Sequence, residues 1–518
     1  MKGVSSKKGV YCKAGTNRGL PEKLAGFVQD NLGRALWPKD LPKGIHEDLA
    51  VYKTGLEKAG FEVVTHDVHP EIMVQGQFMF LPVGAAFSVP PCPSGNPYTP
   101  PVEGRPIGID LFAGAGGLSL GFEQAGFDIA ACVEIDPIHC ATHEYNFPYA
   151  ASICQSVIDL TGAMIRKMAG IGDRDIDVVF GGAPCQGFSL IGKRAMDDPR
   201  NQLVAHYVRL VKELTPKYCV FENVKGLTIG KQKQFLQQLI ETLGEIGYHV
   251  VQPYRVLNAA DYGVPQNRLR LFLVAYRDGQ SPPVYPEKKI KQVTVADAIS
   301  DLPDADLFEG LKFSDSVAAS WATKSKYARR LRGLLIDPED FSYPRCYEKG
   351  ELTCSLRTTH TGESIRRFIE AVPGATEPVS RFYKLSYDGL CNTLRAGTDS
   401  ARGAFTSPRP IHPSCPRVIT VREAARLHSY PDWFRFHVTK WHGFRQIGNS
   451  VPPLLGRAVA SEIIRATGLT ASRPTEAISL GEKALLAMNM CQAAEHFSVP
   501  ASVIAQRTRK KREDGVCD

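Results

Sequence analysis

The chain has 518 residues, which leaves room for two to four domains of about 100–200 residues and excludes a single small binding module. Its composition, 43% hydrophobic and 22% charged, is typical of a globular chain with a large core and excludes wholesale disorder. The formal net charge of +8 is unevenly distributed, because Lys324 to Arg417 contains 16 Lys and Arg against 10 Asp and Glu. That segment could face phosphates.

Location and redox state are predicted from features that the sequence lacks. No stretch approaches the roughly 18 uninterrupted apolar residues of a membrane span, and residues 1–10 lack the order of a secretion signal. The 13 cysteines include no CxxC pair, which argues against a zinc site or a disulfide framework. We expect a cytoplasmic, nucleoid-associated protein with reduced and mostly buried thiols, no membrane contact and no metal.

Five segments are predicted along the chain. Residues 1–104 form an N-terminal extension of unassigned function that ends in a run rich in proline and glycine. Residues 105–280 alternate short apolar runs with helix-like stretches, which is the pattern of an α/β core with a doubly wound sheet. Residues 281–445 lose this periodicity and should form a smaller irregular domain. Residues 446–470 return to the core, and residues 471–518 form an extension with a basic tail, also unassigned.

The predicted elements of the core follow one another from residue 107. Strands are expected at the runs IGIDLF, IAACVEI, DVVFGG, YCVFENV and RLFLVAY, and helices at 421–427 and 459–466. The sequence also contains one internal similarity. Residues 55–64 and 121–130 share five of ten residues at the same offsets. We interpret both as unrelated helix-to-strand turns, and the alternative is a divergent duplicate without its glycine loop.

A glycine-rich stretch, DLFAGAGGL, follows the first of these strands and precedes a helical pattern. Glycines in this context let the backbone approach a ligand such as a nucleotide. Glu134 stands at the end of the next strand, where a doubly wound fold places a carboxylate against ribose hydroxyls. A structural turn with an acid nearby by chance is the alternative interpretation of these two features alone.

Three further strand ends carry reactive or charged side chains. Cys185 lies in GGAPCQGFS after the strand DVVF, where flanking proline and glycine predict an exposed thiol. Glu222 ends the run YCVFE, and Arg268 and Arg270 open the strand LFLVA on the same side. Because strand ends in a doubly wound sheet share one crevice, these groups are expected to meet there.

The order of these motifs resembles the DNA (cytosine-5) methyltransferase family of prokaryotic or phage type. The resemblance spans Ile109 to Ala460 and rests on seven segments in the family's order: DLFAGAGGLSLGF, VEIDP, GGAPCQGFS, FENVKGL, DYGVPQNRLRLFLVA, RVITVREAARLHSYPDWF and QIGNSVPP. It implies a Rossmann-like S-adenosylmethionine-dependent core, a smaller target-recognition domain and double-stranded DNA as partner. It also implies a target cytosine flipped out of the duplex.

The resemblance also implies roles for single residues. Cys185 would be the nucleophile that adds to carbon 6 of cytosine, Glu222 would hold N3 and the exocyclic amine, and Arg268 and Arg270 would grip phosphate and base carbonyl. This chemistry is needed because carbon 5 of an aromatic ring is a poor nucleophile until the thiolate adduct makes it an enamine. The cofactor would be held by Phe112, Gly114, Gly116, Gly117, Leu118, Glu134, Pro184, Asn449, Ser450 and Val451.

Contacts with DNA are expected mainly from the irregular segment. Thr393 and Leu394 resemble the Thr-Leu pair of the family's target-recognition domain, and the residues expected to touch DNA are Ser189, Gln266, Thr393 and Arg395. Further candidates for phosphate or guanine contacts are Arg381, Lys384, Arg402 and Arg409. For each of these residues singly, a solvated surface position is the competing interpretation.

Two departures and two rival functions stay open. The family's acid beside the adenine is replaced by the polar neutral stretch from Ile153 to Val157, and Ala183 stands where a second proline is common. A tRNA cytosine methyltransferase of the same fold and a catalytically dead DNA-binding regulator are the rivals, although intact Cys185 and Glu222 argue against the second. We expect a monomer, as a modification enzyme with or without a cognate restriction endonuclease.

Overall fold

The computed structural model describes the backbone of residues 61–65 and 78–82, and residues 97–184, 202–230, 232–289, 291–397 and 409–504. The chain divides into two units, residues 1–92 and 93–518, whereas the sequence pattern places the boundary after residue 104. In the first unit, β1 (Phe61–Thr65) pairs antiparallel with β2 (Phe78–Pro82). The second unit contains every predicted site residue.

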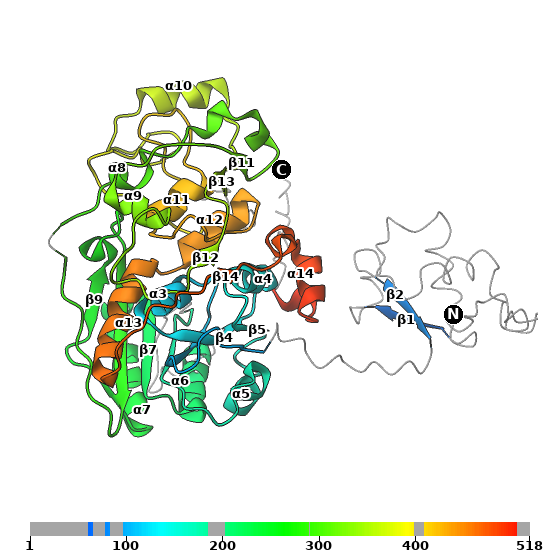
Figure 1. Cartoon of the computed structure of the whole chain (residues 1–518), viewed down its shortest axis with the longest axis vertical. Coiled ribbons are helices and arrows are strands. Elements are labelled where there is room, and N and C mark those ends of the chain that lie inside the picture. Colours follow the sequence, from blue (N-terminus) through cyan, green and yellow to red (C-terminus); the bar gives the residue numbers. More distant parts are fainter. Residues whose placement is uncertain are drawn as a thin grey trace, which may run out of the picture. The chain divides into compact units, whose positions relative to one another are not determined.

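The second unit is built on one mixed sheet. Its strand order is β5-β4-β3-β6-β7-β10-β8; β3 to β7 are parallel, and β10 runs antiparallel to β7, β8 and β9 (Figure 1). All five predicted strand runs are confirmed. The strands are β3 (Ile107–Leu111), β4 (Asp128–Glu134), β5 (Ala151–Cys154), β6 (Val178–Gly181), β7 (Tyr218–Val224), β8 (Tyr248–Val250), β9 (Arg255–Asn258) and β10 (Leu269–Arg277).

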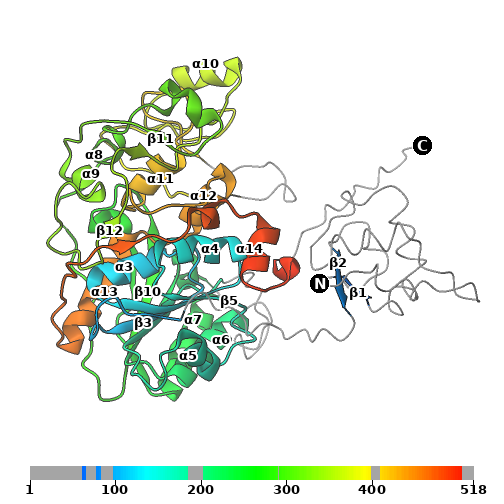
Figure 2. The ribbon, with the colours of Figure 1, turned by 45° about the vertical axis from the view of Figure 1, so that its right-hand side comes forward.

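Helices cover both faces of this sheet. Figure 2 shows α3, α4 and α13 on one face and α5, α6 and α7 on the other, which is the doubly wound arrangement predicted from the sequence. The helices are α3 (Gly117–Ala125), α4 (Pro137–Asn146), α5 (Gly162–Ala169), α6 (Gln202–Leu214), α7 (Gln232–Glu245) and α13 (Pro453–Thr467). The predicted helix at 459–466 lies within α13.

Residues 281–445 contain short elements joined by long loops, as their composition predicts. Their helices are α8 (Val295–Ile299), α9 (Lys326–Leu331), α10 (Gly362–Glu370), α11 (Val421–Leu427) and α12 (Lys440–Asn449), and their strands are β11 (Val317–Ala318), β12 (Arg345–Cys346) and β13 (Glu351–Leu352). Single 3₁₀ turns in this unit lie at Lys225–Thr228, Ala259–Tyr262, Ala305–Leu307, Glu309–Lys312, Lys483–Ala487 and Ala501–Val503.

The irregular part and the core are tied together by buried ion pairs. Arg345 of β12 pairs with Glu123 of α3 at 2.8 Å, and both side chains are completely buried. Arg105 pairs with Asp128 at 2.7 Å and also donates to the Phe341 carbonyl. A buried charge is tolerated only when it is paired, so residues 341–345 belong structurally to the core.

Residues 471–504, called here the C-terminal strap, also pack on the core. Its strand β14 (Ile478–Ser479) pairs in parallel with β12. Beyond it, α14 (Met490–His496) packs beside α4, and Leu485, Leu486 and Phe497 share an apolar cluster with Tyr145. The strap is therefore an integral part of the second unit.

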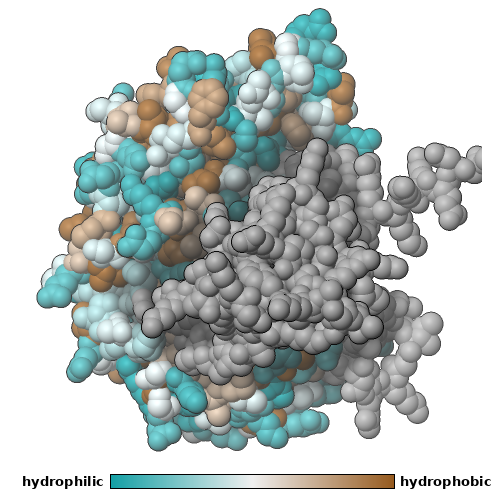
Figure 3. All heavy atoms as spheres, turned by 90° about the vertical axis from the view of Figure 1, so that its right-hand side faces the viewer, coloured by the Kyte–Doolittle hydropathy of each residue, from teal (hydrophilic) through white to brown (hydrophobic). Residues whose placement is uncertain are grey.

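The surface and the cysteines agree with the composition. On the described part of the face in Figure 3, hydrophilic and hydrophobic residues are interspersed. Among the described residues, no helix is long and apolar enough to cross a membrane. Six of the nine cysteines that the structure describes are buried, and none of the nine is in a disulfide.

Candidate active site

The glycine-rich loop after β3 has an unusual backbone. Phe112, Gly114 and Gly116 have positive φ angles of 63°, 56° and 97°, a region that glycine enters readily and other residues rarely adopt. A Cβ atom on Gly116 would lie 2.6 Å from a ring carbon of Phe147. The loop therefore requires glycine at this position.

Gly117 joins this loop to the segment expected to close the cofactor site. A Cβ atom on Gly117 would lie 2.5 Å from the Val451 carbonyl oxygen and 2.8 Å from Ser450 Cβ. Asn449 is exposed, Ser450 is partly exposed, and Leu118 and Val451 are buried. The two expected cofactor segments are thus in direct backbone contact.

Glu134, at the end of β4, reaches back to the same loop. Its carboxylate accepts hydrogen bonds from the backbone N–H groups of Gly114 at 2.8 Å, Ile135 at 3.0 Å and Asp136 at 2.9 Å. These donors fix the orientation of the carboxylate. A carboxylate has about four acceptor positions, so one remains for a ribose hydroxyl.

The expected adenine side lies beyond the end of β5. Cys154 is buried there, whereas Gln155 and Ser156 are partly exposed. The Ser156 hydroxyl accepts a hydrogen bond from the Ile158 backbone at 3.2 Å. The stretch from Ile153 to Val157 therefore presents neutral polar groups at this strand end.

A buried polar chain that the sequence analysis did not identify lies beneath the glycine loop. Asp110 and Ser119 are 2.6 Å apart, Ser119 and His143 are 3.0 Å apart, and all three side chains are buried. Burial raises the pKa of Asp110 to about 8 and lowers the pKa of His143 to about 3. The only signal in the sequence is an acidic residue inside an otherwise apolar strand.

Asp110 predicts a pH-dependent stability. Its folded-state pKa of about 8 lies above the ordinary value of 3.8, so the unfolded chain loses this proton first and the free energy of unfolding falls as pH rises between these values. The Asp110→Asn variant is expected to lack this loss, on the order of several kcal/mol. Urea unfolding of both proteins between about pH 5 and about pH 8 measures it.

Glu423 provides a control, because its pKa is shifted in the direction opposite to that of Asp110. Burial opposes its ionisation, but the Arg417 guanidinium at 2.8 Å lowers the pKa of Glu423 to about 2. This carboxylate therefore stabilises the fold at neutral pH, and Glu423→Gln should destabilise it there. Equal pH slopes in wild type and Asp110→Asn would show that Asp110 does not carry the effect.

The acid at the end of β7 lies next to the turn that follows β6. A Cβ atom on Gly182 would lie 2.5 Å from Glu222 Oε2, and Arg270 Nε lies 2.9 Å from Glu222 Oε1. Burial raises the pKa of Glu222, an effect that Arg270 and then Arg268 oppose. The structure thus places a carboxyl group with a raised pKa and an arginine at one point of the sheet edge.

The expected nucleophile follows that turn in the sequence. Cys185 and Ser189 lie outside the described residues, whereas Pro184 is described and exposed. Asn223, the neighbour of Glu222, donates a hydrogen bond to the Ala183 carbonyl at 3.0 Å. This asparagine was not identified as a site residue, although it lies in the motif FENV.

Arg268 does not occupy the surface position expected of a phosphate contact. Its side chain is completely buried and donates to the carbonyl oxygens of Leu394, Gly448 and Ser450, each at 2.7 Å. Arg270 lies in β10 and pairs with Glu222, whereas Arg268 lies directly before this strand. The extended pattern groups the two arginines in the sequence, but their side chains have different partners in the structure.

Gln266 is likewise enclosed rather than presented to DNA. It is completely buried, accepts from the Leu394 backbone N–H at 3.1 Å and donates to the Leu427 carbonyl at 3.2 Å. Thr393 donates to the Asn267 carbonyl at 2.6 Å and is partly exposed, while Arg395 is exposed. Of Gln266, Thr393 and Arg395, only Arg395 is fully exposed.

The other basic candidates also differ in exposure. Arg381 is exposed, but Lys384 is buried and donates to the Phe368 carbonyl at the end of α10, which corrects its assignment as a surface contact. Arg409 stacks over the Phe444 ring at 4.6 Å, and Arg402 lies outside the described residues. Among the described residues, no cluster of histidine, cysteine and acidic side chains could hold a metal ion.

Comparison with known proteins agrees with this geometry. A family model described as C-5 cytosine-specific DNA methylase matches residues 108–465. The Type II methyltransferase M.XorII of Xanthomonas oryzae pv. oryzae is 63% identical over 405 residues, covering 78% of this chain and 95% of that protein. The Type II methyltransferase M.AgeI of Thalassovita gelatinovora is 32% identical over 425 residues, covering 68% and 98%.

A solved structure shares the architecture. It is described as a DNA modification methyltransferase encoded within an Escherichia coli prophage, and it is 34% identical with a TM-score of 0.60. The match covers 70% of this chain and 100% of that chain. The family model spans more than half of the sequence and includes every strand of the sheet. The chain therefore belongs to the C-5 cytosine-specific DNA methylase family, the DNA (cytosine-5) methyltransferases.

Proposed function

We propose that this methyltransferase transfers a methyl group from S-adenosylmethionine to carbon 5 of a cytosine flipped out of a specific duplex sequence, through a covalent adduct with Cys185. The observation that carries the proposal is the position of Glu222, whose carboxyl group lies beside Gly182 and is paired with Arg270. Gly182 precedes Cys185 by three residues. An acid, a base-binding arginine and a nucleophile would therefore meet at one strand end.

The residues around the glycine loop fit S-adenosylmethionine, which supplies the methyl group when bound. Gly114 and Gly116 give the loop its positive φ angles, and Glu134 presents an oriented carboxylate to ribose hydroxyls. Gly117, Ser450 and Val451 would form the wall on the methionine side. On the adenine side, Gln155 and Ser156 would replace the acid that is usual in the family.

The chemistry at the base begins with Cys185. The thiolate would add to carbon 6 while Glu222, whose pKa burial raises, gives a proton to N3. The resulting enamine makes carbon 5 nucleophilic enough to take the methyl group. Loss of the proton at carbon 5 to water then restores the carbon 5–carbon 6 double bond and expels the Cys185 thiolate, while N3 returns its proton to Glu222. Arg270 would hold the base carbonyl and keep Glu222 oriented.

The direct test is incubation with labelled S-adenosylmethionine and mixed-sequence duplex DNA or tRNA. Nucleoside analysis and base-resolution mapping should place 5-methylcytosine in DNA at one short recurring sequence. Label confined to tRNA would move the protein to the RNA-modifying branch. Tight DNA binding without any label would favour a DNA-binding regulator.

The biological setting belongs to the same proposal. Similarity to Type II methyltransferases supports a modification enzyme, alone or with a cognate restriction endonuclease. We expect it to act as a monomer in the cytoplasm, in association with the nucleoid. Cleavage of unmodified DNA by a neighbouring gene product, blocked by this methylation, would distinguish the paired enzyme from the solitary one.

Specificity should reside in the irregular segment from Lys324 to Arg417. Because residues 341–345 are part of the core, an exchange should take only residues 361–409 and should bring the donor's own Thr-Leu pair. The chimera is expected to methylate the donor's sequence, as measured by mapping 5-methylcytosine in plasmid DNA. An unaltered site in a folded, active chimera would contradict this assignment.

A further inference from the structure

Two buried side chains hold the backbone of Leu394 in the recognition segment. Gln266 Oε1 accepts from the Leu394 N–H at 3.1 Å, and Arg268 Nη1 donates to the Leu394 carbonyl at 2.7 Å. Gln266 and Arg268 both lie in the segment directly before β10. Leu394 is therefore fixed at both its backbone donor and its acceptor.

The same side chains reach Ser450 in the wall of the cofactor site. Arg268 Nη2 donates to the carbonyls of Gly448 and Ser450. Gln266 Nε2 lies 2.9 Å from Nδ1 of His428, whose Nε2 lies 3.2 Å from the Ser450 carbonyl. Burial, and after it Arg268, lowers the pKa of His428, so the ring is neutral and its Nε2–H donates to Ser450. Leu394, Gln266, His428, Ser450 and Arg268 thus form a closed ring of hydrogen bonds.

Two glycines bring the backbone around this ring close to the recognition segment and to the glycine-rich loop. A Cβ atom on Gly448 would overlap the Ala396 backbone nitrogen, next to Arg395, and one on Gly117 would lie 2.5 Å from the Val451 carbonyl. At Gly448 the nearest atoms are all backbone atoms, and at Gly117 the nearest atom is the Val451 carbonyl oxygen, with Tyr430 and Ser450 beside it. A shift at residues 394–396 would therefore move residues 448–451 and press on the glycine loop.

We propose that Gln266, Arg268 and His428 are positioning residues that couple DNA binding at Thr393–Arg395 to cofactor binding at Gly117 and Ser450. The inference rests on the proposed function, which supplies the two ligands, and it assigns His428 a role for the first time. Each ligand then favours the ring geometry that the other requires, so their binding free energies are coupled.

The substitutions at His428 separate coupling from packing. His428→Gln can place its amide Nε2 near the position of the ring Nε2 and keep the bond to Ser450. His428→Asn is too short and should lose it. Calorimetry without DNA is expected to show about tenfold weaker S-adenosylhomocysteine binding by His428→Asn, the effect of one lost buried hydrogen bond, and near wild-type binding by His428→Gln.

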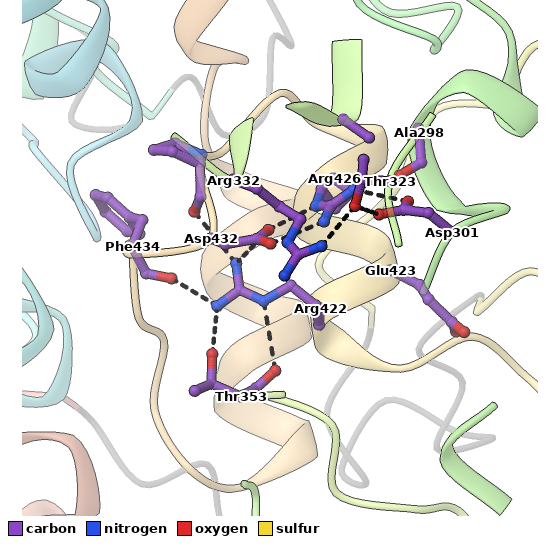
Figure 4. Close-up of polar contacts among 12 residues, drawn as sticks. Ala298, Asp301, Thr323, Arg332, Thr353, Arg422, Glu423, Arg426, Asp432 and Phe434 are labelled. Carbon is purple, nitrogen blue, oxygen red and sulfur yellow. Dashed lines mark hydrogen bonds and ion pairs between the residues drawn. The ribbon is translucent and has the colours of Figure 1, made fainter. Parts of the chain in front are cut away.

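A second measurement uses the duplex that the chain methylates. In wild type the duplex should tighten S-adenosylhomocysteine binding, and in His428→Asn and Arg268→Lys this tightening should be largely lost. Arg422→Lys is the matched control. Arg422 is also a buried arginine, and it donates to the main-chain carbonyls of Pro431, Phe434 and Thr353, the last two labelled in Figure 4. None of these three partners belongs to the ring. The Arg422→Lys variant should have a lower Tm, but the duplex should still tighten its binding of S-adenosylhomocysteine.

The outcomes distinguish the two proposals. If wild type fails to bind S-adenosylhomocysteine, the proposed function fails and the coupling fails with it. If wild type binds and folded His428→Asn matches it with and without DNA, only the coupling is overturned. A loss of tightening in Arg422→Lys equal to that in Arg268→Lys would also overturn it, because general destabilisation would then explain both.

Discussion

Replacement of Cys185 by alanine is expected to lower the rate of methyl transfer by about 10⁴-fold or more, because the enamine at carbon 5 cannot form without the thiolate. DNA binding should be largely retained, since the phosphate and base contacts come from other residues. Transfer of labelled methyl groups to duplex DNA, together with a gel-shift titration, measures both quantities.

A duplex that contains 5-fluorocytosine at the mapped site adds a second measurement. Fluorine at carbon 5 cannot leave as a cation, so the wild-type protein should remain covalently attached to this DNA after denaturation. The Cys185→Ala variant should form no such adduct. Turnover retained by the variant would show that another residue, or no residue, attacks carbon 6.

Glu222→Gln is expected to slow catalysis by about 10²–10³-fold, the usual cost of removing one charge-stabilising or proton-donating group from a dry site. The amide keeps the size of the side chain beside Gly182 but has no acidic proton for N3. The measurement is single-turnover methyl transfer at saturating DNA and S-adenosylmethionine, which separates the chemical step from binding.

The pH dependence of the same rate tests the mechanism behind this loss. Because burial raises the pKa of Glu222, its protonated form persists to higher pH, and the wild-type rate should fall as pH rises beyond that pKa. Formation of the thiolate has the opposite dependence. Glu222→Gln should lack the falling limb, whereas an unchanged rate and profile would remove Glu222 from the reaction.

Much of the fold could be predicted because its strands have strong local patterns. The five apolar runs of the core are uninterrupted and end in glycine or charged residues, so their positions could be read without tertiary information. Residues 281–445 have few such runs, and their positions depend on contacts such as Arg345 with Glu123, which are 222 residues apart. Pattern analysis cannot see pairs at that separation.

The positions of the site residues were harder to predict than the strands, because several of the polar side chains are buried. Glycine positions and Glu134 follow from backbone requirements that are visible in the sequence. Arg268, Gln266 and Lys384 are polar residues that propensity assigns to the surface, yet each lies inside the protein because main-chain carbonyls or N–H groups satisfy it. Such partners are set by the tertiary fold, and no local pattern marks them.

The pairing of β12 with β14 bears on how the chain is made. During synthesis α3 emerges early, but its Glu123 cannot be buried as an ion pair until Arg345 on β12 has been translated, and β12 itself pairs with β14 near the C-terminus. The separate pairing of β12 with β14 can therefore form only when the ribosome has delivered almost the whole chain. Two fragments separated within residues 281–340 should each be unstable alone and should regain activity when they are produced together.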